Sequence, residues 1–568
     1  MAKISEKIVQ LGWFCGFSLT TITGRPLNLK NPRFIFPKSP VLYRCFCSIS
    51  KSDVILSSTS RVVVRENINL TDKERRIFDL LLQVVYHCNL GTQLRVAGGW
   101  VRDKLLGKEC CYDIDIALDN MMGQEFCEKV NDYLVSTGEK TKGIGVIQSK
   151  PEKSKYLETA RMRLFDVWID FVNLSSKEYT QISKILPMEF GSAEQDAYRR
   201  DLTINSLFYN IQTCSVEDFT GRGLDDLKNG KIVTPLPPKE MFLEDPLRVL
   251  RAIRFSARFD FKMVKELKVA AADNDVKSAF YDKTSRERIG HEIELMISGN
   301  QPMKAIACIS ELGLFWVVFR LPPNFEHLVS EELDKTCVGY MDAAWILMNA
   351  KRGSTFSDEQ RRLYLYAALF LSLRKTMFGC NKEQKISVVK HIFKKSLKLR
   401  HSDGDEVVRL HNAVERFSSM IPFIISSEYM KPVEVDWKVD MINVPVSLKL
   451  RLLLGLLLND IKDFWRPALM LSIMLIKGSP VESKIGVFEK VQEEILKLDL
   501  DKVWEVQPLV NERDIMKLLE FKNGGPVVSE WRRKVIQWQL AYPYGNVEEC
   551  INWMMKQKRE QLKQLPAK

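Results

Sequence analysis

Two aspartates on one expected strand are the residues in this chain best placed to do chemistry. Asp113 and Asp115 lie in residues 112–118, where Ile114 and Ile116 alternate with them. Because side chains along a strand alternate between the two faces of a sheet, both carboxylates point the same way and both isoleucines point into a core. Two like charges so close repel each other, and a hard divalent cation compensates for that repulsion. The pair therefore predicts a Mg²⁺ site.

A glycine-containing turn precedes this pair and fits the phosphates of a nucleotide. Residues 94–97 are expected to form a short apolar strand and residues 100–106 a helix, with Gly98 and Gly99 between them. A backbone without side chains can approach a phosphate closely, and the first amides of a helix attract anions. A carboxylate pair beside such a turn indicates nucleotidyl transfer.

A third acidic residue, Asp170, lies on a later expected strand over residues 167–172. Alternation places it on the face opposite to Ile169 and Phe171, out of the core. Asp170 is therefore a candidate third carboxylate for the same site. The alternative interpretation is an exposed acid on an edge strand.

Residues 199–205 combine two arginines, an acid, a hydroxyl and an amide at the start of an expected helix. Guanidinium groups such as that of Arg200 fork onto triphosphate oxygens, and the Asn205 amide can both donate to and accept from ribose hydroxyls. Arg200, Asp201 and Asn205 are therefore candidate nucleotide-binding residues. An ordinary capped surface helix would have a similar sequence.

A further helix, expected over residues 244–255 with a proline near its first turn, carries Asp245 and Arg248 on one face. A carboxylate only accepts hydrogen bonds and a guanidinium only donates them. The pair therefore matches the amino group and ring acceptor of cytosine and adenine, and it mismatches uracil and guanine. The alternative is an intrahelical salt bridge worth roughly 0.2 to 0.5 kcal/mol. Arg251, on the same helix, is added to the nucleotide-binding set.

The amino-acid composition limits the classes of protein to which this chain can belong. A chain of 568 residues is long enough for a few domains, and its formal charge of +12 fits a polyanionic partner, although a basic solvated surface would give the same charge. The 12 cysteines include no Cys-x-x-Cys, and the six histidines form no pair at metal-ligand spacing. A zinc site and a His-Asp phosphohydrolase centre are therefore not expected.

The first 50 residues differ from the rest, with seven Lys or Arg and the single acid Glu6. A basic, acid-poor and serine-bearing segment is typical of an organellar transit peptide. The alternative is a disordered basic leader. The next methionine after Met1 is Met121, beyond the Asp-x-Asp pair. A leaderless form for nucleus and cytoplasm would therefore need another transcript.

The second half of the chain has helical periodicity and no convincing alternating strand after about residue 256. Helices are expected over residues 287–297, 363–373, 448–458, 468–476, 527–540 and 547–562. The most apolar of these runs are interrupted by charged residues before they reach the roughly 18 apolar residues of a membrane span, so they are predicted to be buried helices. The basic residues 532–534 between Trp531 and Trp538 favour a solvated helix face over a nucleic-acid-binding one.

Taken in order, these motifs resemble those of the class II CCA-adding enzymes, and most of all a eukaryotic, plant-like member. The resemblance runs from about residue 70 to residue 320 and more loosely to the C-terminus. The metal, ribose, hinge, nucleotide-template and final helical motifs of that family are similar to residues 98–115, 199–205, 218–227, 244–248 and 285–289.

The resemblance implies an α+β fold, in which a small mixed β-sheet head is followed by an elongated helical neck, body and tail. We expect a leader over residues 1–55, a catalytic head over 70–235, a neck with the nucleotide-selecting helix over 236–320, and a tRNA-binding body and tail over 321–568. Neither membrane insertion nor an obligate protein partner is expected.

The resemblance also implies an activity, the addition of C, C and A to the 3′ end of tRNA from CTP and ATP without a nucleic-acid template. Asp113 and Asp115 would hold two Mg²⁺ ions, and Asp170 would help to align or deprotonate the primer hydroxyl. Arg102 joins the nucleotide-binding set through its place in the metal motif. The expected location is the mitochondrion, the plastid or both.

The chain departs from the expected eukaryotic pattern at Arg161 and Ser175, where Thr and Arg were anticipated. This departure bears on how a flexible loop couples to the site. Two other functions fit the motifs. A poly(A) polymerase of the same superfamily would share them, and a catalytically silent RNA-binding protein would retain some of them.

Overall fold

The structure is a computed structural model of the whole chain, which divides into two units at residues 52 and 53. The structure describes residues 62–108, 113–147, 159–174, 190–323, 325, 329–350, 356–379, 385–426, 441–521 and 524–564. All of them belong to the second unit. The expected leader and Ser175 lie outside the described residues.

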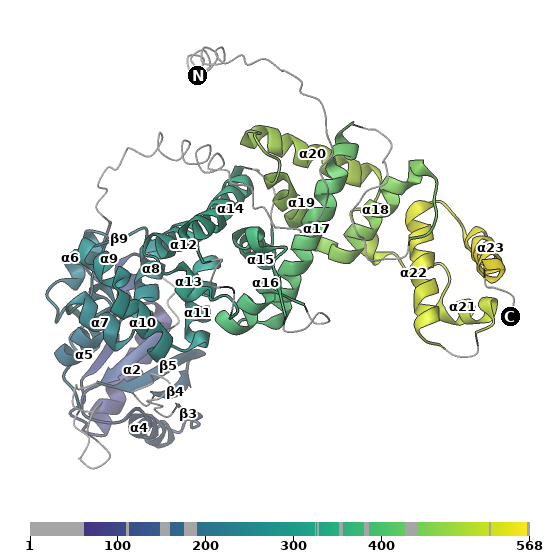
Figure 1. Cartoon of the computed structure of the whole chain (residues 1–568). Coiled ribbons are helices and arrows are strands. Elements are labelled where there is room, and N and C mark those ends of the chain that lie inside the picture. Colours follow the sequence, from purple (N-terminus) through teal and green to yellow (C-terminus); the bar gives the residue numbers. More distant parts are fainter. Residues whose placement is uncertain are drawn as a thin grey trace, which may run out of the picture. The chain divides into compact units, whose positions relative to one another are not determined.

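A mixed seven-stranded sheet lies in the N-terminal part of the described chain, with the strand order β3-β4-β5-β2-β1-β6-β7. β3, β4 and β5 of this sheet are labelled in Figure 1. Its strands are β1 (Leu94–Ala97), β2 (Ile114–Leu118), β3 (Ile144–Ile147), β4 (Thr159–Leu164), β5 (Val167–Asn173), β6 (Phe208–Asn210) and β7 (Ser215–Glu217). β2 and β5 run parallel, and the other neighbouring pairs are antiparallel. The predicted mixed sheet is confirmed.

Strand β4 is absent from the sequence-based expectation, although it lies inside the sheet between β3 and β5. Ala160, Met162 and Leu164 are buried and alternate with more exposed residues, as a strand requires. The segment is rich in Ala, Arg, Met and Leu, which are strong helix formers. Pairing with two neighbouring strands outweighs that local preference.

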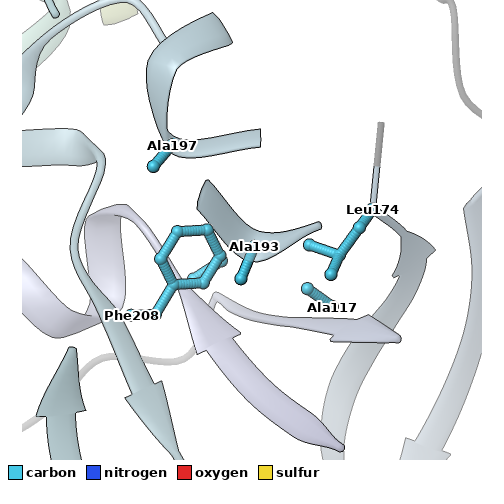
Figure 2. Packing of buried hydrophobic residues seen from close by; sticks show 6 residues of the cluster. Ala117, Leu174, Ala193, Ala197 and Phe208 are labelled. Carbon is cyan, nitrogen blue, oxygen red and sulfur yellow. The ribbon is translucent and has the colours of Figure 1, made fainter. Parts of the chain in front are cut away.

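Helices cover the two faces of the sheet differently. On one face, α4 (Gly123–Ser136) packs against β4 and β5, where the Phe126 and Phe171 rings lie 5.3 Å apart, and α2 (Asp72–His87) packs beside α4. On the other face, α5 (Ala193–Arg199) places Ala193 and Ala197 against Phe208 in a small apolar cluster (Figure 2). That second face also carries Asp115 and Asp170.

The expected helix over residues 244–255 is wrong in one respect, because the chain breaks there. Helix α7 (Pro238–Glu244) ends before Asp245, and α8 (Leu247–Phe259) begins after Pro246. A residue that precedes proline is pushed out of the helical conformation, and Asp245 has φ −136° and ψ 97°. Asp245 therefore lies just before α8, where its carboxylate accepts a hydrogen bond from the Leu247 backbone N–H at 3.3 Å.

The remaining described chain is helical. After β7 come α6 (Gly223–Lys228), α7 and α8, and α8 packs against α11 and α12. The helices after α8 are α9 (Lys265–Ala272), α10 (Asn274–Lys283), α11 (Arg286–Ile297), α12 (Pro302–Glu311), α13 (Phe315–Val318), α14 (Glu331–Ala350), α15 (Asp358–Leu369), α16 (Val388–His391), α17 (His401–Ser426), α18 (Val446–Ile461), α19 (Trp465–Met474), α20 (Val481–Lys497), α21 (Glu512–Leu519), α22 (Pro526–Ala541) and α23 (Val547–Gln564). The six expected helices are confirmed to within a few residues. Only two-residue strands occur in the described residues after 256, namely β9 (Lys262–Met263), which pairs with β8 (Lys231–Ile232), and the pair β10 (Met377–Phe378) and β11 (Ile386–Ser387).

Burial also follows the sequence-based expectation. The apolar residues of α18 and α19 are largely buried, and among the described helices none is long and apolar enough to cross a bilayer. On α22, Trp531 and Trp538 face inward, while Arg532 and Arg533 are exposed. The exposure of these two arginines fits a solvated face and a nucleic-acid-binding face alike, so the solvated face stays a prediction.

A buried ion pair anchors the helix that follows the glycine turn. Lys104 on α3 (Gly99–Leu105) lies 2.7 Å from the Glu74 carboxylate of α2, and both side chains are almost fully buried. Glu74 also accepts hydrogen bonds from the Trp100 indole and from the backbone N–H of Thr71. The charge of Glu74 is thus satisfied only by groups within the fold.

Replacing Lys104 with alanine should therefore lower the free energy of unfolding by about 3 to 5 kcal/mol, because the Glu74 carboxylate would remain buried without its cation. Urea denaturation followed by circular dichroism measures the change. The matched control is Lys108→Ala, whose side chain is 46% exposed and should matter by about 1 kcal/mol or less. Equal effects of the two substitutions would contradict this assignment.

Candidate active site

The structure brings two of the predicted carboxylates onto neighbouring strands. Asp115 on β2 and Asp170 on β5 are direct partners in the parallel register, and Asp113 immediately precedes β2. Ile114 and Ile169 are buried on the opposite face, so the predicted alternation is confirmed. Because β5 lies between β4 and β2, the interpretation of Asp170 as an acid on an edge strand is wrong.

Negative charge accumulates at this point. Burial and then the nearby Asp113 carboxylate raise the pKa of Asp115 to about 6, while Arg200 acts in the opposite direction. An ionised Asp115 is therefore only partly compensated by the protein. A cation bound here would relieve both the burial cost and the repulsion.

Asp170 has a cation of its own in Arg161. The Arg161 guanidinium on β4 donates two hydrogen bonds to the Asp170 carboxylate, at 2.5 Å and 2.6 Å. The two residues are direct cross-strand partners. Arg161, noted in the sequence only as a departure from a pattern, therefore holds the third carboxylate in place.

The oxygen ligands present fit Mg²⁺ with two protein carboxylates. Within the described residues, no three His, Cys, Asp or Glu side chains are arranged to hold a metal ion. Asp113 and Asp115 remain as a pair, because Asp170 is engaged by Arg161. Mg²⁺ typically binds one or two carboxylates and takes its other ligands from water and substrate phosphates.

The turn before α3 admits only glycine at its first position. Gly98 has φ +73°, and a Cβ added there would lie 2.7 Å from Arg200 Nη1 and 3.3 Å from the Asn205 carbonyl oxygen. Gly99 follows at the start of α3 and is exposed. The turn thus keeps a bare stretch of backbone at a helix N-terminus, as expected for phosphate binding.

Arg102 is buried rather than open to solvent. Its guanidinium donates to Asp103 at 2.9 Å and also to the Asn205 side chain, and it lies over the rings of Phe255 and Phe259. Burial lowers its pKa, against the effect of Asp103. Of the predicted nucleotide-binding residues, Arg102 therefore joins the glycine turn to α8.

A series of buried hydrogen bonds continues from the contact between Arg102 and Asn205. Asn205 donates to Asp201 at 2.9 Å, and Asp201 accepts from Arg251 Nε at 2.6 Å. Burial alone would raise the pKa of Asp201, but Arg251 and the hydrogen bond from Asn205 bring it below its usual value. Arg251 and Arg254 both lie near Glu292 of α11. These hydrogen bonds and ion pairs therefore link the head to helices α8 and α11.

The expected helix start at residues 199–205 is wrong. α5 ends at Arg199, and only a single 3₁₀ turn, Thr203–Asn205, follows it. Residues 201–210 are all buried, which also excludes an ordinary surface helix. The reason is that the polar side chains bond within the fold, as Thr203 does to Asp226 at 2.8 Å.

The predicted selector pair is placed differently from the expectation. The Asp245 carboxylate accepts from Arg288 of α11 at 2.8 Å and 3.3 Å, whereas Arg248 donates to Glu244 at 2.8 Å and to the Arg199 carbonyl at 3.0 Å. The alternative of a salt bridge between Asp245 and Arg248 is therefore wrong. Arg288 was missed as a site residue, and the signal for it was its place in the motif over residues 285–289.

Comparison with known proteins shows which sequences this chain is related to. The chain matches the family model described as the Poly A polymerase head domain over residues 94–233. The mitochondrial CCA tRNA nucleotidyltransferase of Saccharomyces cerevisiae is 31% identical over 542 residues, which are 89% of this chain and 95% of that protein. Poly(A) polymerase I of Salmonella typhi is 30% identical over 326 residues, 55% of this chain and 66% of that protein.

The fold is also similar to that of a solved CCA-adding enzyme. The Bacillus stearothermophilus CCA-adding enzyme, solved in complex with CTP, aligns with a TM-score of 0.56 at 18% identity, over 87% of this chain and 100% of that one. At that identity the match shows a shared fold. The similarity to the yeast enzyme, in contrast, extends through the head and the helical part alike. The chain belongs to the CCA tRNA nucleotidyltransferase family.

Proposed function

We propose that this chain adds C, C and A in order to the 3′ end of tRNA, using CTP and ATP, releasing pyrophosphate and needing no nucleic-acid template. The proposal is carried by the carboxylate pair at Asp113 and Asp115 beside a turn that only glycine fits, in a chain related over most of its length to a CCA tRNA nucleotidyltransferase. The head over residues 70–235 would do the chemistry, the neck over 236–320 would select the nucleotide, and the helices over 321–568 would bind tRNA.

In this proposal Asp113 and Asp115 hold two Mg²⁺ ions. Bound Mg²⁺ would supply Lewis-acid activation of the primer hydroxyl and charge neutralisation of the triphosphate. Asp170 helps to orient that hydroxyl. Since both Asp170 oxygens accept hydrogen bonds from Arg161, an aligning role is favoured over proton removal.

Nucleotide selection is assigned to Asp245 and Arg248. The Asp245 side chain is fixed by Arg288 and is 23% exposed, so it can present a carboxylate oxygen to an exocyclic amino group of cytosine or adenine. Arg248 would be the donor. An incoming base would replace some of the hydrogen bonds that Arg248 now makes to Glu244 and to the Arg199 carbonyl. Uracil and guanine would instead place a carbonyl acceptor against the Asp245 carboxylate and an N–H donor against the Arg248 guanidinium.

The assigned location is the mitochondrion, because the leader has transit-peptide composition and the yeast relative is named as mitochondrial. A plastid location, a leaderless form in nucleus and cytoplasm, and the plant-like subtype stay predictions from the sequence.

A direct assay tests the proposed function against its alternatives. The protein is incubated with tRNA lacking its 3′ CCA and with each nucleoside triphosphate singly or together, and the products are sequenced. Addition that stops after C, C and A supports the proposal. Long adenylate tails would indicate a poly(A) polymerase, and no incorporation would indicate a silent RNA-binding protein.

Replacing Asp115 or Asp113 with alanine should reduce nucleotide addition by roughly 10²- to 10³-fold or more, because these charges act on the transition state. tRNA affinity should be almost unchanged, since the helical part would supply most of the RNA contacts. Addition assays and fluorescence anisotropy with labelled tRNA measure the two effects. The control is Asp119→Ala just after β2. Parallel loss of binding and chemistry in a folded variant would refute this division of roles.

Replacing Asp245 with alanine should relax discrimination against UTP and GTP more than it slows addition of CTP. Each buried polar group left unpaired by a wrong base costs about 1 to 3 kcal/mol, which corresponds to roughly 5- to 150-fold in specificity. Ratios of kcat/KM for the four nucleotides measure this change, with Glu240→Ala on the exposed part of α7 as the control. If the variant kept its strict choice, Asp245 would serve only as the partner of Arg288.

A fusion of residues 1–60 to a fluorescent reporter should enter mitochondria, because a segment with eight Lys and Arg and only two acids, Glu6 and Asp53, suits import. Microscopy with organelle markers shows the location. The control fusion carries the same residues with their eight Lys and Arg changed to Gln. A reporter found only in the cytosol would contradict the assignment, and entry into plastids as well would support dual targeting.

A further inference from the structure

One exposed aromatic residue beside the candidate active site has no role in the chemistry described above. Trp168 on β5 is 51% exposed, and it is the only tryptophan of the described residues that is classed as exposed. A large aromatic ring in water loses the stabilisation that burial would give it. Its position therefore suggests that something other than this chain covers the ring.

The ring lies on the catalytic face of the sheet. Trp168 and Asp170 are two residues apart on one strand, so their side chains project from the same face, with their Cα atoms roughly 7 Å apart. The alternate residues Ile169 and Phe171 are fully buried on the other face. Because β2 and β5 are parallel with Asp115 opposite Asp170, the step from Asp170 to Trp168 runs beside the step from Asp115 to Asp113.

Basic residues accompany the ring on the neighbouring strand. Arg163 of β4 is the direct cross-strand partner of Trp168, as Arg161 is of Asp170. The Arg163 side chain is 56% exposed, and its ion pair with Asp166 at 3.4 Å is also exposed. An exposed ion pair of this kind is weak and can be exchanged for a phosphate. The strip beyond Asp170 thus offers one aromatic face, that of Trp168, and one exposed guanidinium group, that of Arg163.

We propose that Trp168 stacks on a base at the single-stranded 3′ end of the RNA primer, and that Arg163 contacts a phosphate beside that base. This inference rests on the proposed function, and it deepens it by placing the primer. Stacking on an aromatic ring is a sequence-tolerant way to hold single-stranded nucleic acid, because every base has a π-face. Such tolerance suits a primer whose last base changes as each nucleotide is added.

The primer is favoured over other occupants by continuity and charge. The attacking hydroxyl must lie at Asp113 and Asp115, and the preceding nucleotide must then lie within a few ångströms of that point. Trp168 is at that range on the same face, and the adjacent Arg163 guanidinium matches a phosphodiester backbone. The mainly apolar surface that a protein partner would use is not what surrounds the ring.

Kinetics of three variants test the proposal. Trp168→Ala should raise KM for tRNA lacking CCA about tenfold, Trp168→Phe should restore most of that loss, and KM for CTP should be little changed by either. Arg163→Ala should lower the steepness with which tRNA affinity falls with salt by about one unit of logarithmic slope. Tyr86→Ala is the matched control, since that ring is 89% exposed on α2, away from the carboxylate face.

A modified primer isolates the stacking contact. With a tRNA whose last nucleotide lacks its base, the wild type and Trp168→Ala should bind equally, whereas with the intact base they should differ about tenfold. Carrying both measurements out as binding, on an Asp115→Ala background, separates this inference from the proposed function, which the addition assay tests on its own.

The proposal is overturned if Trp168→Ala binds intact tRNA as the wild type does, or if the loss persists with the abasic primer. Ultracentrifugation identifies one other occupant: an oligomer that Trp168→Ala dissociates, with primer affinity unchanged, would mean that the ring packs against a second copy.

Discussion

Charge repulsion on one face of the sheet is the constraint on which the rest of the site depends. Asp115 lies on β2 and Asp113 immediately precedes it, and burial and the neighbouring Asp113 carboxylate raise the pKa of Asp115 to about 6. Arg200 offsets part of this charge, and Arg161 satisfies the third carboxylate, Asp170. The pair that remains has the hard oxygen ligands and the unmatched negative charge that favour a divalent cation.

The geometry around that charge is fixed by a bonded chain rather than by single contacts. Arg102 reaches Asn205, Asn205 donates to Asp201, and Asp201 accepts from Arg251 of α8. Buried polar groups keep such partners because an unpaired one would cost about 1 to 3 kcal/mol. The turn before α3 and the helix that follows Asp245 therefore hold one another in place.

The hydrophobic pattern of a segment was enough to predict its secondary structure where its apolar residues recurred with the period of the strand or helix that it forms. The alternation around Asp115 and Asp170 identified β2 and β5. It was insufficient where two tendencies conflicted. Strand β4 has the composition of a helix, and the helix expected over residues 244–255 breaks at Pro246, whose effect on the preceding residue was not included.

By itself, the sequence determined which residue types could perform the chemistry, and it determined the family, because spacing along a strand or around a turn is a local property. Only the tertiary structure decided the partners: Arg161 for Asp170, Arg288 for Asp245, and solvent for Trp168. These pairings depend on strand register and on the packing of helices distant in the chain. Periodicity within one segment carries no information about the register or packing between segments.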